Sequence, residues 1–332
     1  MPNSLITGTG RYVPERVVDN ATIAALCAST PEWIVERTGI ERRHFAAPGE
    51  TASVMGAHAA RRALGQAGRQ PADVDCVLFA TLSPDYLFPG CACLLQAQLG
   101  LREVPCFDVR NQCSGFLYAL SMADAFVRAG SYRCILVVGA ELQSTGLDLS
   151  ERGRELAVLF GDGAGAVLVE ASEAPGRGIV CSHLGADGHC AQELWCEGPA
   201  SSRFPERIDA GMLAEGVQFP HMNGRTVFRH AIQRMKESIE TVLAKGGAEL
   251  ADVHLVVPHQ ANQRITDMLA RLLGIGSDRV FSNIAEVGNT TAASIPIALA
   301  DCVAQGRLQE GKLVVLTAFG SGFTWAATLL RW

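Results

Sequence analysis

The 332-residue sequence lacks several features that would place it in common classes of protein. No stretch of about 18 or more apolar residues occurs, so we expect no transmembrane helix. The first residues show no basic segment followed by an apolar run, so we predict no secretory signal peptide and a cytoplasmic location. No Gly-Lys-Ser or Gly-Lys-Thr string of a phosphate-binding loop is present. A net charge of −6 argues against nucleic-acid binding.

Cysteine is present, but not in the spacing of a disulfide framework or a zinc site. The 11 cysteines are odd in number and scattered, which favours reduced thiols in a cytoplasmic protein. Cys91 and Cys93 form only a C-x-C pair, and the sequence contains no C-x-x-C pair. We therefore expect no metal site.

One glycine-rich string fits a dinucleotide-binding fingerprint but stands in the wrong context. Residues 161–166, Gly-Asp-Gly-Ala-Gly-Ala, match G-x-G-x-x-A. The fingerprint requires a helix to follow, whereas the apolar run 167–170 is typical of a strand. We interpret the string as a close crossing of backbones, with no bound dinucleotide.

What the sequence does contain is one α/β unit used twice. Each copy has a helix, a glycine stop, an Ala-Asp-Val turn and a short apolar strand. These features are residues 57–66, 68, 72–74 and 76–80 in the first copy, and 236–245, 246–247, 251–253 and 255–257 in the second. The shared order indicates an internal duplication.

The correspondence continues into the candidate site. Strand 104–109 leads to Cys113, a helix through Ala129 and Gly130, and then strand 135–139. In the second copy the order is Val280-Phe281, Asn289, a helix, Gly306 and strand 313–316. Cys113 and Asn289 each precede their glycine by 17 residues, so we expect them to hold equivalent places in the two copies.

These patterns predict a layered α/β fold. Continuous apolar strands indicate sheets covered on both faces, and helices alternate with them. We expect two similar halves, residues 1–172 and 173–332, divided in the turn 173–176. Residues 187–222 are rich in Gly, Pro and charge without clear periodicity. We interpret them as a loop insertion that shapes the entrance of the site.

Three side chains suit acyl transfer through a thioester. Cys113 stands at a strand-to-helix bend, where a helix N-terminus favours a thiolate and the Cys113 N–H faces a developing oxyanion. His259 ends a strand and offers a neutral imidazole donor. Asn289 is a donor that takes no proton. Each also has an ordinary reading: a buried structural thiol, a surface or capping histidine, and a helix N-cap.

Seven strings along the chain carry a family resemblance. They are residues 8–10 with Pro14, 32–40, 113–116, 160–166, 258–262, 288–290 and 319–322. In this order they resemble the 3-oxoacyl-[acyl-carrier-protein] synthase III family of thiolase-like condensing enzymes. The resemblance implies a thiolase-like fold of two duplicated halves with αβαβα layers.

The resemblance also implies a homodimer and a ping-pong reaction. Cys113 would accept an acyl group from a short acyl-CoA, which is a substrate rather than a cofactor. Malonyl-acyl-carrier protein would then lose CO2, and its enolate would attack the thioester to give a 3-oxoacyl product. His259 and Asn289 would stabilise the enolate, and the N–H groups of Cys113 and Ser321 would form the oxyanion hole. The glycine loop at 320–322 lacks the second cysteine of thiolases, and Asn289 replaces the second histidine of elongating synthases.

Further residues match positions that bind substrate or partner in the family. The implied contacts to CoA or acyl substrate are Trp33, Arg37, Arg152, Gly224, Phe228 and Asn262, and Phe88 would reach across the dimer to close the acyl pocket. Arg264 matches a carrier-docking position of the family. Arg225 and Arg229 share one helix face by their spacing and could add to a basic patch that attracts an acidic carrier protein, or could simply form a solvated face. Two extra residues between Gly153 and Phe160, relative to the common family pattern, blur the alignment at Arg152.

Three alternatives remain open from the sequence. Residues 110–114 and 82–85 resemble the branch that makes alkylquinolone-type signals, so a specialised condensing enzyme with another acyl donor is the nearest one. A non-catalytic acyl-binding subunit would keep the fold but usually lose the cysteine. An ester- or amide-forming acyltransferase would usually lose part of the Cys, His and Asn set.

Overall fold

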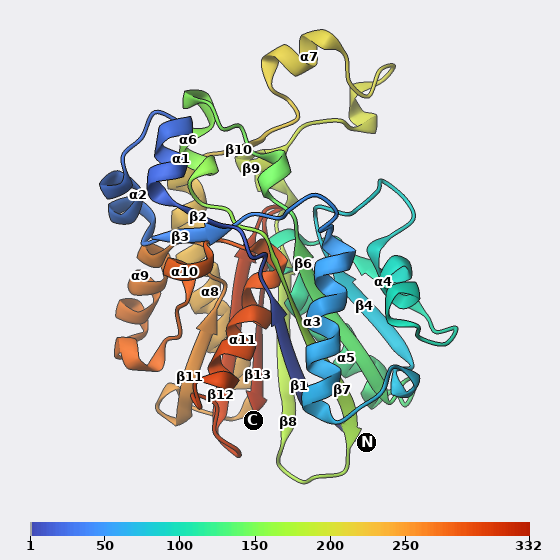
Figure 1. Cartoon of the computed structure of the whole chain (residues 1–332). Helices are drawn as coiled ribbons and strands as arrows, with labels where there is room; N and C mark the ends of the chain where they lie inside the picture. The colour runs from blue at the N-terminus through green and yellow to red at the C-terminus, as the bar shows by residue number, and fades with distance from the viewer. Residues whose placement is uncertain (1) are drawn as a thin grey trace.

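The computed structural model describes residues 2–332, which form two large β-sheets with helices on their faces (Figure 1). The strand order is β1-β7-β6-β4-β5 in the first sheet and β8-β13-β12-β11 in the second. The first sheet comprises β1 (Asn3–Tyr12), β4 (Cys76–Ala80), β5 (Cys106–Val109), β6 (Cys134–Glu141) and β7 (Gly163–Ser172). The second comprises β8 (Gly178–Ala186), β11 (Val253–Pro258), β12 (Leu313–Gly320) and β13 (Thr324–Arg331).

Three layers of helices enclose the two sheets. The outer face of the first sheet carries α3 (Ala52–Ala67) and α4 (Cys91–Leu99), and the outer face of the second carries α8 (Gly224–Gly246) and α9 (Gln263–Leu273). Between the sheets lie α5 (Gly115–Arg128) and α11 (Ser294–Ala304), whose apolar side chains share one core with both. Among residues 2–332, no helix has both the length and the apolar character that a bilayer crossing requires.

Shorter elements gather mainly at one end of these layers, at the top of Figure 1. They are β2 (Val17–Asp19), α1 (Asn20–Leu26), α2 (Pro31–Thr38), β3 (Arg42–His44), α6 (Arg154–Ala157), β9 (Leu194–Cys196), α7 (Ala210–Glu215), β10 (Pro220–Met222) and α10 (Ile284–Val287). The segment that contains α7 projects beyond β9 and β10 (Figure 1). This end of the molecule frames the cavity described below.

The duplication is visible in the backbone itself. The 3-10 turns η1 (Pro71–Asp73) and η7 (Leu250–Asp252) both carry capping boxes, and the residue before each has φ −104° and ψ 159°. Farther along, Gln112 and Thr291 adopt matching left-handed conformations with φ 42° and 45°. Asp73 and Asp252, like Gln112 and Thr291, are 179 residues apart. One constant offset therefore relates these parts of the two copies.

This offset corrects the expected equivalence of Cys113 and Asn289. The counterpart of Cys113 is Ala292, because η2 (Gln112–Ser114) corresponds to η9 (Thr291–Ala293). Helix α11 has 11 residues where α5 has 14, so the glycine that follows it comes earlier. Counting 17 residues back from that glycine therefore reached Asn289 instead of Ala292.

Other expectations are confirmed or extended. The string 161–166 leads into strand β7, as predicted, and not into a helix. Helix α8 begins at Gly224, well before the predicted Lys236, and the buried Val227, Ala231, Ile232 and Met235 continue the helical spacing through its first turns. The segment 187–222 is not only loop: it contains β9, β10 and the six-residue α7. Such short elements do not span enough residues to reveal a period.

Gly165 in β7 offers a test of how closely the layers pack. A Cβ atom placed there would lie 2.5 Å from the backbone nitrogen of Ile297 and 2.6 Å from the carbonyl carbon of Pro296 in α11. We expect Gly165→Ala to lower the free energy of unfolding by about 1–3 kcal/mol, because the backbones must separate. Urea denaturation measures the change. The control is Gly146→Ala, where a Cβ has no neighbour within 4 Å; equal losses in the two variants would contradict the explanation.

Candidate active site

Cys113, His259 and Asn289 line one cavity of about 810 Å³. Cys113 lies in η2, His259 directly after β11, and Asn289 between α10 and η9. Their exposed fractions are 9%, 2% and 5%. The structure thus brings together the three side chains that the sequence pointed to, drawn from both sheets and shielded from bulk water.

The contact of Cys113 with Gly320 fixes the nucleophile at the junction of the two sheets. Cys113 follows the strained residue Gln112 and precedes α5. A Cβ atom at Gly320, the last residue of β12, would lie 3.0 Å from both Cβ and backbone N of Cys113. The hydroxyls of Ser114 and Thr324 also hydrogen-bond at 2.7 Å. The start of α5 is therefore seated against the end of a strand from the other sheet.

The protonation state of Cys113 differs from the sequence-based expectation. Burial, and secondly the nearby Glu141 carboxylate, raise the pKa of the thiol to about 12, and the backbone N–H of Cys113 offsets this only in part. Burial thus opposes the effect of the helix N-terminus on the thiol. The resting form is the thiol, and the sulfur must lose its proton as it attacks.

His259 is a neutral side chain in this environment. Its backbone N–H donates to the carbonyl of Thr317 at 2.8 Å, which fixes it beside β12. Burial lowers the pKa of the imidazole to about 3. Within residues 2–332 the ring Nδ1 is buried without a hydrogen-bond partner, which leaves Nε2 for the cavity. A neutral ring can donate one N–H hydrogen bond to a substrate oxygen.

Asn289 is oriented by backbone contacts on both sides. Its N–H donates to the carbonyl of Leu159 at 2.9 Å, and its carbonyl accepts from the N–H of Gly161 at 3.1 Å. The side-chain Oδ1 accepts from the N–H of Thr291 at 2.9 Å. With Oδ1 occupied, Nδ2 is the group available to the cavity. The N-cap reading is wrong, since the residue before α11 is Ala293.

Gln260 supports this arrangement and was not recognised from the sequence. Its backbone N–H donates to Ser294 Oγ at 2.7 Å. Its side-chain Nε2 donates to the carbonyl of Phe281 at 3.2 Å, and its Oε1 accepts from the N–H of Asn283 at 3.0 Å. The backbone of the fully buried Gln260 therefore joins the end of β11 to α11, and its side chain joins it to the segment before α10.

An aromatic and cationic group stands at the mouth of the cavity. The guanidinium carbons of Arg37 and Arg154 each lie 5.3 Å from the ring centroid of Trp33. Asn262 caps α9 through the N–H of Arg264 at 2.9 Å and donates to the carbonyl of Arg37 at 3.0 Å. Helices α2 and α9 are thus tied together beside Trp33.

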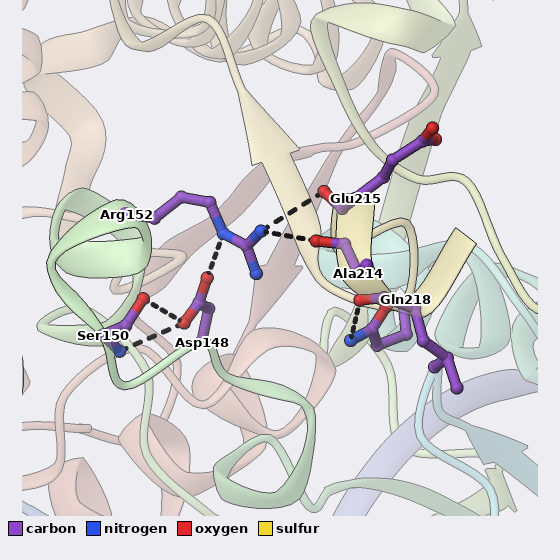
Figure 2. A network of polar contacts seen from close by, with 7 residues as sticks. Asp148, Ser150, Arg152, Ala214, Glu215 and Gln218 are labelled. Carbon is purple, nitrogen blue, oxygen red and sulfur yellow. Dashed lines mark hydrogen bonds and ion pairs between the residues drawn. The ribbon is translucent and has the colours of Figure 1, made fainter. Parts of the chain in front are cut away.

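Arg152 has a different place from the one expected. Its Nε donates to Asp148 Oδ2 at 2.6 Å, and its Nη1 reaches the carbonyls of Ala214 and Glu215 at 3.5 and 3.3 Å (Figure 2). These carbonyls end α7, so the cation holds the projecting segment through a helix C-terminus. Arg154 lies beside Trp33 instead, with its guanidinium carbon 5.3 Å from the ring centroid.

The remaining predicted residues divide into two groups. The lining of the cavity includes Trp33, Arg37, Gly224, Arg225, Phe228, Asn262 and Arg264. Among residues 2–332 the lining does not include Arg152, Phe88, Arg229 or Ser321. Gly320 lines it in place of Ser321, whose hydroxyl donates to the carbonyl of Leu194. No group of three or more His, Cys, Asp and Glu side chains suited to hold a metal ion occurs in this described part of the chain.

Comparison with known proteins places these features in a family. A model of 3-oxoacyl-[acyl-carrier-protein (ACP)] synthase III matches residues 107–188, and a model of the C-terminal part of that protein matches residues 243–332. A beta-ketoacyl-[acyl-carrier-protein] synthase III from Bordetella petrii is 45% identical over 336 residues, covering 100% of this chain and 98% of its own. The chain belongs to the 3-oxoacyl-[acyl-carrier-protein] synthase III family.

Solved structures agree with this membership. The crystal structure of 3-oxoacyl-[acyl-carrier-protein] synthase III from Aquifex aeolicus VF5 is 40% identical, with a TM-score of 0.90 and coverage of 99% and 100% of the two chains. The priming beta-ketosynthase of the R1128 polyketide pathway is 35% identical, with a TM-score of 0.90 and coverage of 99% and 96%. The predicted thiolase-like fold and the predicted acyltransferase class are confirmed.

The neutral state of His259 can be tested by titration. Since burial lowers the pKa of its ring to about 3, we expect the ring to remain uncharged from pH 8 down to pH 5. Nitrogen-15 NMR of histidine-labelled protein measures this, with His259→Asn identifying the signal. A short unstructured peptide that contains one histidine, which titrates near pH 6.5, serves as the control. A His259 signal that titrates with that peptide would contradict the assigned state.

Proposed function

We propose that this chain condenses a short acyl-CoA with malonyl-acyl-carrier protein and releases a 3-oxoacyl-carrier protein, the first condensation of fatty acid synthesis. The supporting observation is that Cys113, His259 and Asn289 meet in one buried cavity. The full-length similarity to synthase III proteins makes this reaction the natural one for that set.

In the first step Cys113 accepts the acyl group. The sulfur attacks the thioester carbonyl, the bond to the CoA sulfur breaks, and the proton of the Cys113 thiol ends on the released CoA. The carbonyl oxygen becomes an oxyanion that the N–H groups of Cys113 and Ser321 stabilise. The close contact of Gly320, the residue before Ser321, with the backbone N of Cys113 supports this pairing.

In the second step the malonyl group supplies the carbon nucleophile. The bond to its carboxylate breaks, CO2 leaves, and the electron pair passes to an enolate. His259 Nε2–H and Asn289 Nδ2 donate to the enolate oxygen, and its carbon attacks the Cys113 thioester, which releases the thiolate. Since decarboxylation creates the carbanion, two neutral donors are sufficient, and a histidine with a pKa of about 3 suits that role.

Substrate binding follows from the mouth of the cavity. The indole of Trp33 and the guanidinium groups of Arg37 and Arg154 fit a purine and its phosphates. Gly224, Phe228 and Asn262 line the path inward for the pantetheine and acyl group. The exposed cations Arg225, Arg229 and Arg264 lie on α8 and α9 and would attract an acidic carrier protein.

A homodimer and a cytoplasmic location complete the proposal. Phe88 is 85% exposed, and its neighbours Tyr86 and Leu87 are also exposed. Three adjacent large apolar side chains in water favour burial against a partner. A second copy would cover them and bring Phe88 to its acyl pocket. Size-exclusion chromatography with light scattering tests the dimer.

A second candidate is a specialised condensing enzyme. It is favoured by the strings 110–114 and 82–85, and by the similarity to the priming synthase of a polyketide pathway. Supplying acetyl-CoA with malonyl-carrier protein, or anthraniloyl-CoA with malonyl-CoA, separates the two candidates by product. A protein that gains no acyl mass from any acyl-CoA would instead act as a non-catalytic acyl-binding subunit.

The central prediction follows from the separate roles of Cys113 in acyl loading and of His259 and Asn289 in decarboxylation. Cys113→Ala removes the nucleophile, so intact-mass spectrometry should show no acyl-enzyme. His259→Ala and Asn289→Ala should still form the acyl-enzyme but lower decarboxylation of the malonyl substrate by about 100-fold or more, because each loses an enolate donor. Failure of Asn289→Ala to load would contradict the assigned roles.

The assignment of Arg154 in place of Arg152 gives a further prediction. We expect Arg154→Ala to raise KM for acyl-CoA by roughly 3- to 30-fold, the loss of one cation–π and phosphate contact. Arg152→Ala is the matched control and should change KM less than about 2-fold. An acyl-pantetheine donor, which lacks the nucleotide, should not distinguish the variants. A larger rise in KM for Arg152→Ala than for Arg154→Ala would instead support the sequence-based assignment of the CoA contact to Arg152.

A further inference from the structure

Glu141 is a fully buried carboxylate that the proposed mechanism leaves without a role. It is the last residue of β6 and has an exposed fraction of 0%. Among residues 2–332 no basic side chain forms an ion pair with it. A buried carboxylate surrounded only by neutral donors is costly to keep, so its hydrogen bonds indicate what it holds.

One set of donors comes from the segment directly after β4. Oε2 accepts from the hydroxyl of Ser83 at 2.6 Å and from that of Thr81 at 3.2 Å. The backbone N–H of Leu82 lies 3.2 and 3.3 Å from the two carboxylate oxygens. Glu141 therefore anchors the beginning of the exposed loop that carries Phe88.

The other donors come from the segment that follows Asn289. Oε1 accepts from the N–H of Ala292 at 3.4 Å. Gln143 Nε2 lies 3.3 Å from Glu141 Oε2 and 3.4 Å from Thr291 Oγ1, so it bridges the two. Thr291 in turn donates its N–H to Asn289 Oδ1 at 2.9 Å. The carboxylate thus reaches Asn289 through one turn of backbone.

That turn is strained and needs support. Thr291 is β-branched and has φ 45°, a conformation that such residues rarely adopt. Its N–H orients the Asn289 amide, so relaxation of the turn would redirect Nδ2 away from the cavity. Glu141 contacts Ala292 and Gln143 contacts Thr291, and within residues 2–332 none of these four residues belongs to the cavity lining.

We propose that Glu141 is a positioning residue: acting through Gln143, Thr291 and Ala292, it holds the amide of Asn289 in the orientation required to stabilise the enolate. The inference rests on the proposed function and assigns Glu141 a positioning role in the condensation step. Besides burial, its charge also raises the pKa of the Cys113 thiol, so its removal should not slow loading. The inference predicts a variant that loads acyl groups normally and condenses poorly.

The test compares two half-reactions in the full-length protein. Loading is measured by intact mass after mixing with acetyl-CoA, and condensation by release of CO2 from malonyl-carrier protein. We expect Glu141→Leu to load within about threefold of the parent protein and to condense at least about tenfold more slowly. Glu141→Gln should remain within about threefold in both steps. Its oxygen can accept from Ala292 and Leu82, and its NH2 can donate to the Ser83 and Thr81 hydroxyls.

Asp75→Leu is the matched control for general loss of stability. Asp75 accepts from the N–H groups of Arg133 and Cys134 at 2.8 and 3.1 Å, at the opposite end of the same strand from Glu141. It should leave the ratio of the two half-reactions unchanged. If Glu141→Leu does not fold, Gln143→Leu takes its place, with loading unchanged and condensation lowered several-fold.

Two results would overturn the proposal. One is a Glu141→Leu or Gln143→Leu enzyme that condenses as fast as the parent protein. The other is an equal loss of loading and condensation, which would indicate a purely structural role. A parent protein that neither loads nor condenses would instead refute the proposed function, and so the two failures are distinguishable.

Discussion

The close approach of each half of the chain to the other at two glycines is the constraint on which the site depends. Gly320 at the end of β12 touches Cys113, and Gly139 in β6 touches the backbone of Ala292, where a Cβ would lie 2.4 Å from the carbonyl oxygen. A Cβ at Gly139 would force the backbones apart, and a Cβ at Gly320 would press tightly against Cys113. The turn that starts each central helix therefore rests on a strand of the opposite sheet, and the cavity forms where the halves meet.

Within residues 2–332 the duplication produces two similar seams, and the cavity described above lies at one of them. His259, Cys113 and Gly320 surround the cavity, and the residues 179 positions earlier or later are Ala80, Ala292 and Glu141. At the second seam a carboxylate replaces the glycine and its hydrogen bonds fill the space. The seam at Cys113 and Gly320 thus provides reactive groups, and the seam at Ala292 and Glu141 supports the segment that carries Asn289.

Much of this architecture could be predicted from the sequence. Apolar strands, glycine stops and the repeated Ala-Asp-Val turns indicated the duplicated layers, and the motifs around Cys113, His259 and Asn289 indicated the site. The remainder depends on tertiary contacts that no local pattern encodes. The raised pKa of the Cys113 thiol follows from burial, and the place of Arg154 follows from the packing of α6 against Trp33 in α2. The donors to Glu141 come from two segments, around Thr81 and at Ala292, that are about 210 residues apart.

The attachment of α7 has a consequence for how this scaffold diversifies. The segment closes at its base, where the N–H of Gly198 donates to the carbonyl of Val217 at 3.0 Å. All residues of α7 are exposed or half-buried, and Arg152 clasps its end. Loop-closure entropy grows only slowly with loop length. The segment that contains α7 can therefore change in length or sequence while the Gly198–Val217 hydrogen bond and the Arg152 contact stay in place. Changes in this segment can therefore alter the entrance of the cavity without moving Cys113, His259 or Asn289.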